Sequence, residues 1–519
     1  MGFTVIVNLV IIQNGIGYVD IMLSMLPSVI FVVGVSYIIH ILSRYAEELS
    51  KNQDKNIAIF NTFKNIWSTI VITVITTSIG FLSLYLIQIK PIQNFAIYSA
   101  ISILTTGLFT LFLLPILLTF INPKLIFKGK SVVTSEGLTH DIFLTKILRN
   151  SKTIQFSTLG LVLIFTIGLG QIETNNNFLD DLSHQSDLGK ELAFFENSFG
   201  GIRPFEMSIQ SHSDSLLTYQ NILELEKVHH YLENTYQVSG IISPITLIKS
   251  ANKSFNGGLS SAYILQKNES DFTKLIQKMR KNKIFRKYTY VISTDFKFGR
   301  IFGQNLDYGS RTYAYKNELL STFLDAHHFK TSFQLSGSAE LMDDTNSKIA
   351  KNLLFGIGIG IFVVTLIIGF IFGSVRIALV SILPNAIPIL VIAGIMGFMG
   401  IDLKVATALA FTIVFGIAVD DTIHIMKRIK RELKINNEMT LAITNTYQST
   451  GKAVVLTSLI ISAGFLAFIS SEFTGLFYFG FLISAGIISA LFADYILLPI
   501  LILKTDSPTN YQSVNSLCC

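Results

Sequence analysis

Residues 415–428 read Phe-Gly-Ile-Ala-Val-Asp-Asp-Thr-Ile-His-Ile-Met-Lys-Arg, and they place two adjacent carboxylates, Asp420 and Asp421, inside an apolar segment. The whole segment, 404–426, is long enough to cross the hydrocarbon core of a bilayer, which takes about 20 helical residues. A charged side chain at that depth costs about 2.5–3.5 kcal/mol on insertion scales. The two acids are therefore expected to face the interior of a bundle of membrane helices or a water-filled cavity.

The composition agrees with a membrane protein. Hydrophobic residues make up 50% of the chain and charged residues 14%, and the mean hydropathy is +0.54, whereas soluble chains usually contain about 25% charged residues. Lysine and arginine gather in a few loops, so the net charge of +6 indicates membrane topology and not nucleic-acid binding. The only cysteines are Cys518 and Cys519, which excludes a disulfide framework and a cysteine-based metal site.

Nine segments of about 18 or more mainly apolar residues are predicted to span the membrane. They are 21–42, 66–87, 93–121, 153–171, 350–373, 376–400, 404–426, 452–471 and 476–503. A partial apolar run at 2–13 resembles the end of another spanning helix.

Between the fourth and fifth spans, residues 172–349 are polar and contain short alternating apolar runs. We expect strands at 204–210 and 288–294, and amphipathic helices at 219–236 and 270–281. The predicted fold class is an α-helical polytopic membrane protein, a duplicated bundle with one inserted α+β domain.

The predicted chain has six parts, and their order follows from the spans. They are an incomplete first-half bundle at 1–121, a cytoplasmic linker at 122–152, the first span of the second half at 153–171, the inserted domain at 172–349, the five-span second-half bundle at 350–503 and a cytoplasmic tail at 504–519. Basic residues cluster in three loops that alternation of the spans places on one side, so that side is expected to be cytoplasmic and the inserted domain extracytoplasmic.

An internal repeat relates the two membrane blocks. His40-Ile-Leu-Ser-Arg44 matches His424-Ile-Met-Lys-Arg428, and Leu113-Leu-Pro-Ile-Leu117 matches Leu497-Leu-Pro-Ile-Leu501, with 384 positions between the members of each pair. Further pairs at this offset share Glu, Ala, Asn, Thr and Gly, which chance similarity of apolar segments does not supply. We expect a parallel duplication with a pseudo-twofold axis along the membrane normal, which brings equivalent helices together at the centre of the bundle.

The same offset places the start of the first copy before residue 1. The first copy then lacks its first span, its soluble domain and its second span. We expect the chain to be the C-terminal part of a longer duplicated protein or the downstream half of a split gene, with a separately encoded N-terminal half as a partner.

Three stretches, in a duplicated bundle, resemble one superfamily. The acidic stretch 415–428 resembles a motif of each transporter half, Leu383-Pro-Asn-Ala-Ile-Pro388 resembles a proline-bearing span, and Phe199-Gly-Gly201 before a strand resembles the entry to a porter domain. The chain is thus similar to the resistance–nodulation–division (RND) superfamily, and most of all to MMPL-like exporters related to Patched and other sterol-sensing-domain proteins.

The resemblance implies six spans per half and a ferredoxin-like extracytoplasmic domain. It also implies a cytoplasmic (inner) membrane location and export of lipid-like, hydrophobic or amphiphilic molecules driven by inward proton flow. The expected partners are therefore membrane lipids or hydrophobic small molecules, and protons. The proton gradient supplies the energy, so no cofactor or metal is expected and the chain is a secondary active transporter, not an enzyme. Self-association into a homo-oligomer stays open.

The acidic pair is expected to relay protons. Two adjacent carboxylates in a medium of low dielectric constant cannot both ionise cheaply, so they should bind and release protons as a coupled pair. His424 lies one helical turn past Asp420 and can relay a proton or hold a carboxylate. Asp494, in the last span, is a further intramembrane acid, and Thr457 and Ser458 can supply hydroxyl groups.

Structural interpretations compete with this relay. The aspartate pair could be a static hydrogen-bonded contact, the histidines His424 and His40 could only pack, and Asp494 could face cytoplasmic water. Asp343-Asp344 is interpreted as a solvated helix start and not as a metal site.

The first half departs from the acidic pattern. Ser36 and Tyr37 occupy the positions of Asp420 and Asp421, and Thr110 that of Asp494. We expect the Ser36 and Tyr37 hydroxyls to donate hydrogen bonds to the opposite acids. Because one half lacks the acids, a lipid-binding sensor or receptor without pumping remains an alternative. An accessory proton motor for secretion, as in another branch of the superfamily, is a third possibility. A non-functional fragment is a fourth, because an exporter path normally runs between two soluble domains and only one is present.

Overall fold

The structure is a computed structural model that describes residues 1–20, 22–51, 54–87, 89–123, 146–175, 177, 182, 186–212 and 215–505. Most of the predicted linker at 122–152 and nearly all of the predicted tail at 504–519, including the two cysteines, lie outside these residues. The chain forms two units: a membrane unit of residues 1–173, 348–471 and 475–519, and an α+β unit of residues 174–347 and 472–474.

Nine helices in the described part of the chain are long and apolar enough to cross a membrane, and they confirm the nine predicted spans. They extend over Leu23–Lys51, Lys55–Leu86, Lys90–Phe120, Ser151–Leu169, Phe355–Phe372, Val375–Met399, Val405–Asn436, Met439–Ser470 and Thr474–Lys504. Several end later than predicted, because backbone hydrogen bonding continues through polar residues beyond the apolar run. A shorter apolar helix, α1 (Gly2–Gly15), precedes them.

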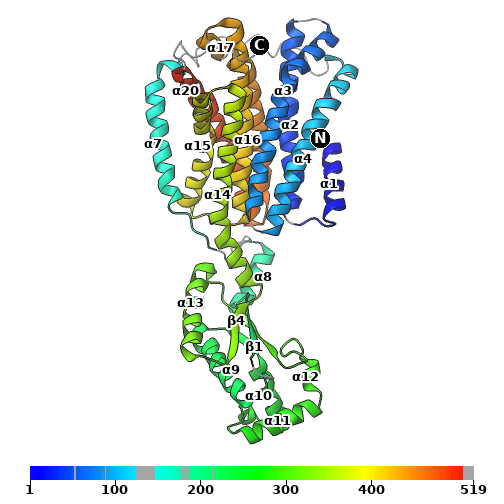
Figure 1. Cartoon of the computed structure of the whole chain (residues 1–519), viewed down its shortest axis with the longest axis vertical. Coiled ribbons are helices and arrows are strands. Elements are labelled where there is room, and N and C mark those ends of the chain that lie inside the picture. The colour runs from blue at the N-terminus through cyan, green and yellow to red at the C-terminus, as the bar shows by residue number, and fades with distance from the viewer. Residues whose placement is uncertain are drawn as a thin grey trace. The chain divides into compact units, whose positions relative to one another are not determined.

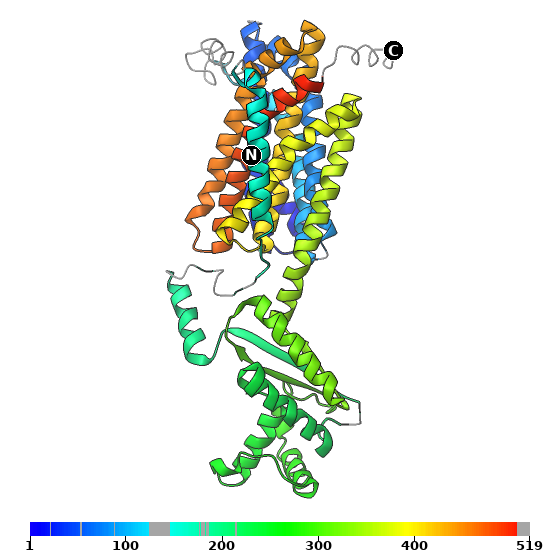
Figure 2. The same cartoon turned by 90° about the vertical axis from the view of Figure 1, so that its left-hand side faces the viewer.

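The first-half helices α2 (Leu26–Lys51), α3 (Lys55–Leu82) and α4 (Lys90–Phe120) pack against one another (Figure 1). In the second half, α7 (Ser151–Leu169) packs on α15 (Val375–Met399), as Figure 2 shows. α14 (Ser338–Phe372) is a single continuous helix.

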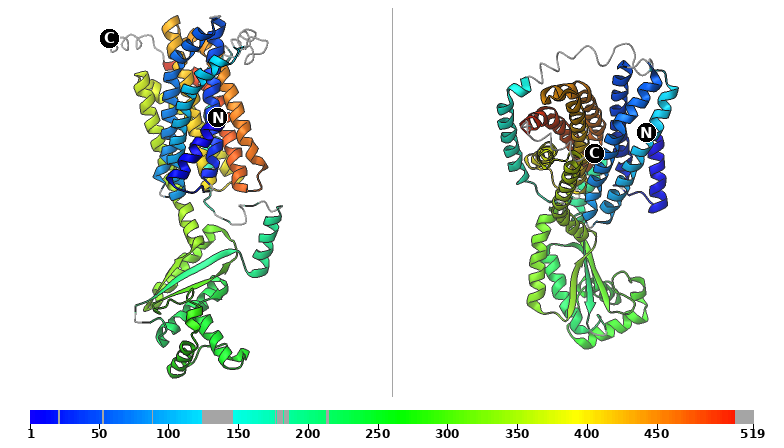
Figure 3. Two further views of the ribbon diagram at one scale, coloured as in Figure 1. Left: turned by 90° about the vertical axis from the view of Figure 1, so that its right-hand side faces the viewer. Right: turned by 45° about the horizontal axis from the view of Figure 1, so that its top comes forward.

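α16 (Val405–Asn436) is central to the membrane unit, and it contacts both α3 and α15 (Figure 3). Every residue of its most apolar 18-residue window is buried. The acidic segment therefore faces protein on all sides, as expected for intramembrane acids.

The last two spans contain π-helical turns. The penultimate span consists of α17 (Met439–Thr446), the π-helix η6 (Tyr447–Gly451), α18 (Lys452–Leu466) and the 3-10 helix η7 (Ala467–Ser470). The last span consists of α19 (Thr474–Phe492), the π-helix η8 (Ala493–Leu497) and α20 (Leu498–Thr505). Single π-turns are frequent at functional sites, and η8 contains Asp494.

The α+β unit contains a four-stranded sheet in the order β2-β3-β1-β4. Its strands are β1 (Arg203–Ser211), β2 (Ser239–Ile242), β3 (Phe298–Asn305) and β4 (Thr331–Ser336), all antiparallel to their neighbours. α9 (Tyr219–Tyr231) joins β1 to β2, and α13 (Gly309–His327) joins β3 to β4. This βαββαβ arrangement is ferredoxin-like, as the resemblance implied.

The remaining helices of this unit lie at its start and between β2 and β3. α8 (Asp187–Phe199) precedes β1, while α10 (Pro244–Phe255), α11 (Glu269–Lys281) and α12 (Ile284–Lys287) extend the connection that is a short hairpin in the simplest form of the fold. One face of β1 is buried through Phe205, Met207 and Ile209, so the strand alternates as predicted.

The predicted strand at 288–294 is wrong. Backbone hydrogen bonds from Val291 and Ile292 back to Tyr288 close a turn there, and Ile292 makes only an isolated bridge to Gly299. The third strand is β3, which contains Gly299 and Gly303 and has little intrinsic strand preference. It forms because β1 and β2 supply hydrogen bonds on both of its edges, and this tertiary context outweighs propensity.

Candidate functional site

The repeat-related helices α2 and α16 meet through equivalent residues. The Ser36 hydroxyl donates to Asp420 Oδ2 over 3.4 Å, and these two residues are 384 positions apart. One turn further along, the rings of His40 and His424 stack with their centroids 3.9 Å apart and their planes at 5°. The pseudo-twofold relation inferred from the sequence therefore brings the two copies into direct contact at this site.

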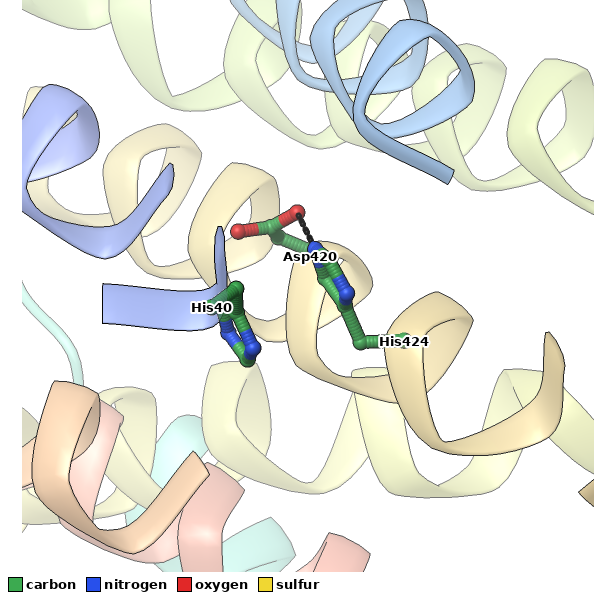
Figure 4. A group of neighbouring side chains, drawn as sticks. All are labelled: His40, Asp420 and His424. Carbon is green, nitrogen blue, oxygen red and sulfur yellow. Dashed lines mark ion pairs between the residues drawn. The ribbon is translucent and has the colours of Figure 1, made fainter. Parts of the chain in front are cut away.

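Asp420 is buried, with 5% of its surface exposed. Its Oδ1 atom lies 3.6 Å from His424 Nε2, within the same helix (Figure 4). The hydroxyl of Thr73, from α3, also reaches this carboxyl group. Asp420 thus meets side chains of three helices: its own, α2 and α3.

Asp421 faces the other histidine. Its Oδ1 atom lies 3.6 Å from His40 Nε2, and the Ser458 hydroxyl of α18 donates to its Oδ2 atom over 3.3 Å. Each aspartate therefore has one histidine and one serine beside it. Asp420 has a histidine from its own helix and a serine from the first half. Asp421 has a histidine from the first half and a serine from α18 of its own half.

Two predicted hydroxyl groups lie elsewhere. Tyr37 is fully buried on α2, and its side chain lies beside Thr77 of α3. Thr457 is fully buried as well, and its hydroxyl donates to the Val454 carbonyl oxygen of its own helix over 2.9 Å. Neither makes a hydrogen bond to Asp421 among the contacts of the described residues.

Asp494 belongs to a second polar cluster. It is 1% exposed, and its Oδ1 atom accepts a hydrogen bond of 2.7 Å from the Thr422 hydroxyl. The Thr422 hydroxyl also lies 3.3 Å from Asn385 Oδ1 of α15, and the Tyr447 hydroxyl donates to the Asp494 carbonyl oxygen over 2.6 Å. The alternative that Asp494 faces water is therefore wrong, because the π-helical turn directs it into the protein.

A network of ion pairs lies one to two turns beyond the histidines. Glu47 of α2 pairs with Arg428 of α16 at 2.9 Å and with Arg44 at 2.5 Å. Arg44 also pairs with Glu48, and Arg428 with Glu432. The last two pairs are repeat-equivalent, and Glu47 joins them across the pseudo-twofold axis.

The interpretation of Asp343-Asp344 as a solvated helix start holds for Asp344, which is exposed, and is wrong for Asp343. The side chain of Asp343 is 15% exposed and pairs with Arg203, whose own side chain is 3% exposed. Arg203 also lies 4.3 Å from the ring centroid of Tyr313. Asp343 therefore anchors α14 to the start of β1 within the α+β unit.

The ligand atoms of His40, Asp420 and His424 all lie within 4.8 Å of one another (Figure 4). This is close enough for a metal ion, but the two imidazole rings are almost parallel. Their nitrogen lone pairs lie in the ring planes, so they do not converge on one point as tetrahedral coordination requires. The arrangement instead suits exchange of protons among two carboxylates and two imidazoles.

Sequence reasoning missed His40 and Glu47 as site residues. On its own helix His40 has no acid one turn before it, so its local sequence favours a packing role. The repeat offset is the signal that identifies His40, because His40 is the equivalent of His424. Equivalent residues on two helices related by the pseudo-twofold axis lie near the same axis. Glu47 has no such signal, because Arg431 stands at its equivalent position.

Comparison with known proteins identifies a family and a relative of similar sequence. The model of the MMPL family matches residues 1–146 and 324–505. The Methanocaldococcus jannaschii protein MJ1562, named as a membrane protein, is 23% identical over 379 residues, which cover 69% of this chain and 93% of that protein.

Solved structures show the fold. SecDF from Thermus thermophilus matches with a TM-score of 0.57 and 15% identity, over 97% of this chain and 58% of that one. SecDF in its super-membrane-facing form matches with a TM-score of 0.54 and 14% identity, over 99% of this chain and 60% of that one. The hedgehog release protein Disp of the water bear Hypsibius dujardini matches with a TM-score of 0.61 and 13% identity, over 93% of this chain and 64% of that one. The chain thus spans less than two thirds of the length of these RND superfamily members, and the expected resemblance is confirmed.

Proposed function

Since the chain belongs to the MMPL family, whose members are membrane transporters, we propose that it couples inward proton flow to export of lipid-like or other amphiphilic molecules. The proposed location is the cytoplasmic membrane. The α+β unit is proposed to lie on the extracytoplasmic side, because the basic loops mark the opposite side as cytoplasmic.

The single observation that carries this proposal is the buried cluster of Asp420, Asp421, His40 and His424 at the contact of the two halves. Intramembrane ionisable residues are rare, and in membrane proteins they commonly mark proton pathways. A purely structural pair of acids would need strong, fixed hydrogen bonds. Here the serine contacts measure 3.3–3.4 Å, and one oxygen of Asp420 and Nε2 of each histidine have no hydrogen-bond partner among the described residues.

The distances also indicate how the relay could be gated. Each aspartate lies 3.6 Å from its histidine, which is longer than an N–H···O hydrogen bond. A proton therefore passes only when the two groups of a pair approach each other or when a water molecule bridges them. Because the His40–Asp421 pair joins the two halves, movement of one half against the other would open and close that step of the path. Each proton that crosses 100 mV then supplies about 2.3 kcal/mol.

The test uses the full chain in proteoliposomes with a pH-sensitive dye inside and an imposed proton gradient. We expect proton flux that rises with an amphiphilic substrate, and loss of this flux in Asp420→Asn and in Asp421→Asn. Asn keeps the size and hydrogen bonding of Asp but cannot take up the proton. The matched control is Asp187→Asn on α8, where the side chain is 99% exposed.

Undiminished coupled flux in both relay variants would refute the relay. A wild-type chain that binds the amphiphile without any proton flux would favour the second candidate, a lipid-binding sensor. The specific observation for that candidate is the replacement of the acids by Ser36, Tyr37 and Thr110 in the first half.

A further inference from the structure

The membrane unit contains a cavity of about 360 Å³ between the C-terminal parts of α2 and α16, where α16 becomes strongly basic. Its wall includes six cationic side chains: Arg44, Lys427, Arg428, Lys430, Arg431 and Lys434. The inner end of the cavity reaches His40 and His424. The proposed relay does not use the cations, so they need another explanation.

Glu47 is the single acid that lines this cavity among the described residues. Its carboxylate is already engaged by Arg428, Arg44 and Lys51. Together with Glu48 and Glu432, which bind the same two arginines, it compensates Arg44 and Arg428. Three carboxylates do not balance the six cations, so the wall keeps a net positive charge.

Two of those cations have no ion pair within 4 Å in the described part of the chain: Arg431 and Lys434. A third, Lys427, is held by the neutral hydroxyl of Ser68 at 2.8 Å. Positions 427, 431 and 434 follow the helical spacing that places side chains on one face, so they present their positive charge to the same space. A concave surface of one sign concentrates ions of the other sign.

Cytoplasmic loops of membrane proteins generally contain an excess of cations. The internal repeat tests whether this general excess explains the cations of the cavity wall. The first-half equivalents of Lys427, Lys430, Arg431 and Lys434 are Ser43, Ala46, Glu47 and Ser50. Arg44 and Arg428, by contrast, are retained in both halves. If the excess of cations in cytoplasmic loops alone explained the second-half cations, the equivalent face of α2 would be basic as well. The extra cations belong to this cavity and not to both helix ends.

The wall chemistry fits a phosphate group. Arginine presents paired N–H donors that match phosphate oxygens, and charge-assisted bonds of this kind are the strong ones. Ser43, Ser449 and Thr450 add hydroxyl groups to the wall. Ser449 and Thr450 belong to or border the π-helical turn η6, so the irregular backbone faces the same space.

We propose that this cavity is a binding site for a phosphate group, held by Lys427, Arg431 and Lys434 at the mouth of the histidine pair. The group comes either from inorganic phosphate and soluble phosphate esters or from the headgroup of an anionic phospholipid. The site does not depend on the proposed transport, because it rests on the cavity and its charges alone.

The test measures equilibrium binding of inorganic phosphate and of pyrophosphate to the full chain in nanodiscs of neutral phosphatidylcholine. We expect saturable binding that high chloride weakens. Arg431→Gln and Lys427→Gln should each weaken it about tenfold or more, since each removes a charge-assisted hydrogen bond. Lys64→Gln is the matched control, because Lys64 is exposed next to Asn65 of the cavity wall and should leave binding unchanged.

A second series uses nanodiscs that contain phosphatidylglycerol. Competition by this lipid assigns the site to a headgroup, and unchanged binding of inorganic phosphate assigns it to the soluble anion; both support a phosphate site. The charge-conserving variants Arg431→Lys and Lys427→Arg, which should retain most of the binding, separate loss of charge from misfolding. The proposal is overturned if the wild-type chain binds none of these anions, or if folded Gln variants bind as tightly as the wild type.

Discussion

His40 shows how much a single residue in this protein depends on its partner half. On its own helix it has no acid one turn before it, yet in the structure it stacks on His424 and lies 3.6 Å from Asp421. Both of these partners belong to α16, the equivalent helix of the other half.

The residue-scale prediction is that His40→Phe will stop proton-coupled flux while the protein stays folded. Phe retains a flat ring that can stack on His424, but it cannot bind a proton. We expect at least a tenfold loss of flux, since proton transfer by a positioned group commonly contributes about 10²–10⁴-fold. The measurement is the proteoliposome dye assay, with thermal stability as the check on folding.

A packing role for the histidines makes the opposite prediction. In that case His40→Phe would transport normally, and only a small replacement such as His40→Ala, which empties the space, would impair the protein. Normal flux in His40→Phe would therefore contradict the relay role of this histidine.

At the scale of elements, α7 and α15 approach closely through glycines. A Cβ atom added at Gly397 would lie 1.7 Å from the carbonyl oxygen of Gly168, and one added at Gly394 would lie 2.4 Å from Phe165. Small residues at such contacts let membrane helices pack backbone to backbone. This contact fixes α7, most of whose surface is otherwise exposed, to the second-half bundle.

We predict that Gly397→Ala will lower the stability of the membrane unit by about 1–3 kcal/mol, because overpacking a tight contact forces the helices apart. The measurement is the thermal unfolding of the purified protein in detergent. Gly160→Ala is the control, since nothing lies within 4 Å of a Cβ atom at that position of α7. Equal stability of the two variants would show that the α7–α15 contact does not depend on its glycines.

At the scale of the whole molecule, the distribution of charge defines an orientation. The short loops at 14–20, 88–94 and 471–475 contain Lys90 as their single basic residue. The loops at the other ends of the spans are basic, and the α+β unit follows a span that leaves the basic side. The unit should therefore lie outside the cytoplasm.

This orientation can be tested with single cysteines, because Cys518 and Cys519 are the only native ones and can be replaced by Ser. We predict that Ser260→Cys, at an exposed position of the α+β unit, will react with a membrane-impermeant maleimide in intact cells. Lys152→Cys, exposed at the start of α7, should react only after lysis. The reverse pattern would invert the proposed topology.

The nine spans, the duplication, the inserted α+β domain and the acidic pair could all be predicted from the amino-acid sequence. The spans could be predicted because the length of an apolar segment is a local property of the sequence. The duplication could be predicted because a constant offset between matching residues is visible without coordinates. The sequence did not predict β3, because its glycines adopt a strand only when β1 and β2 lie on either side.

Which side chains contact one another could not be predicted from the sequence and required the three-dimensional structure. The stacking of His40 on His424, the contacts of His40 with Asp421 and of Ser36 with Asp420, the bridge made by Glu47 and the burial of Asp494 all depend on distances between residues far apart in the chain. The symmetry of the repeat predicts that equivalent helices meet. Which faces they present is set by packing of side chains around them, and that is a property of the whole bundle.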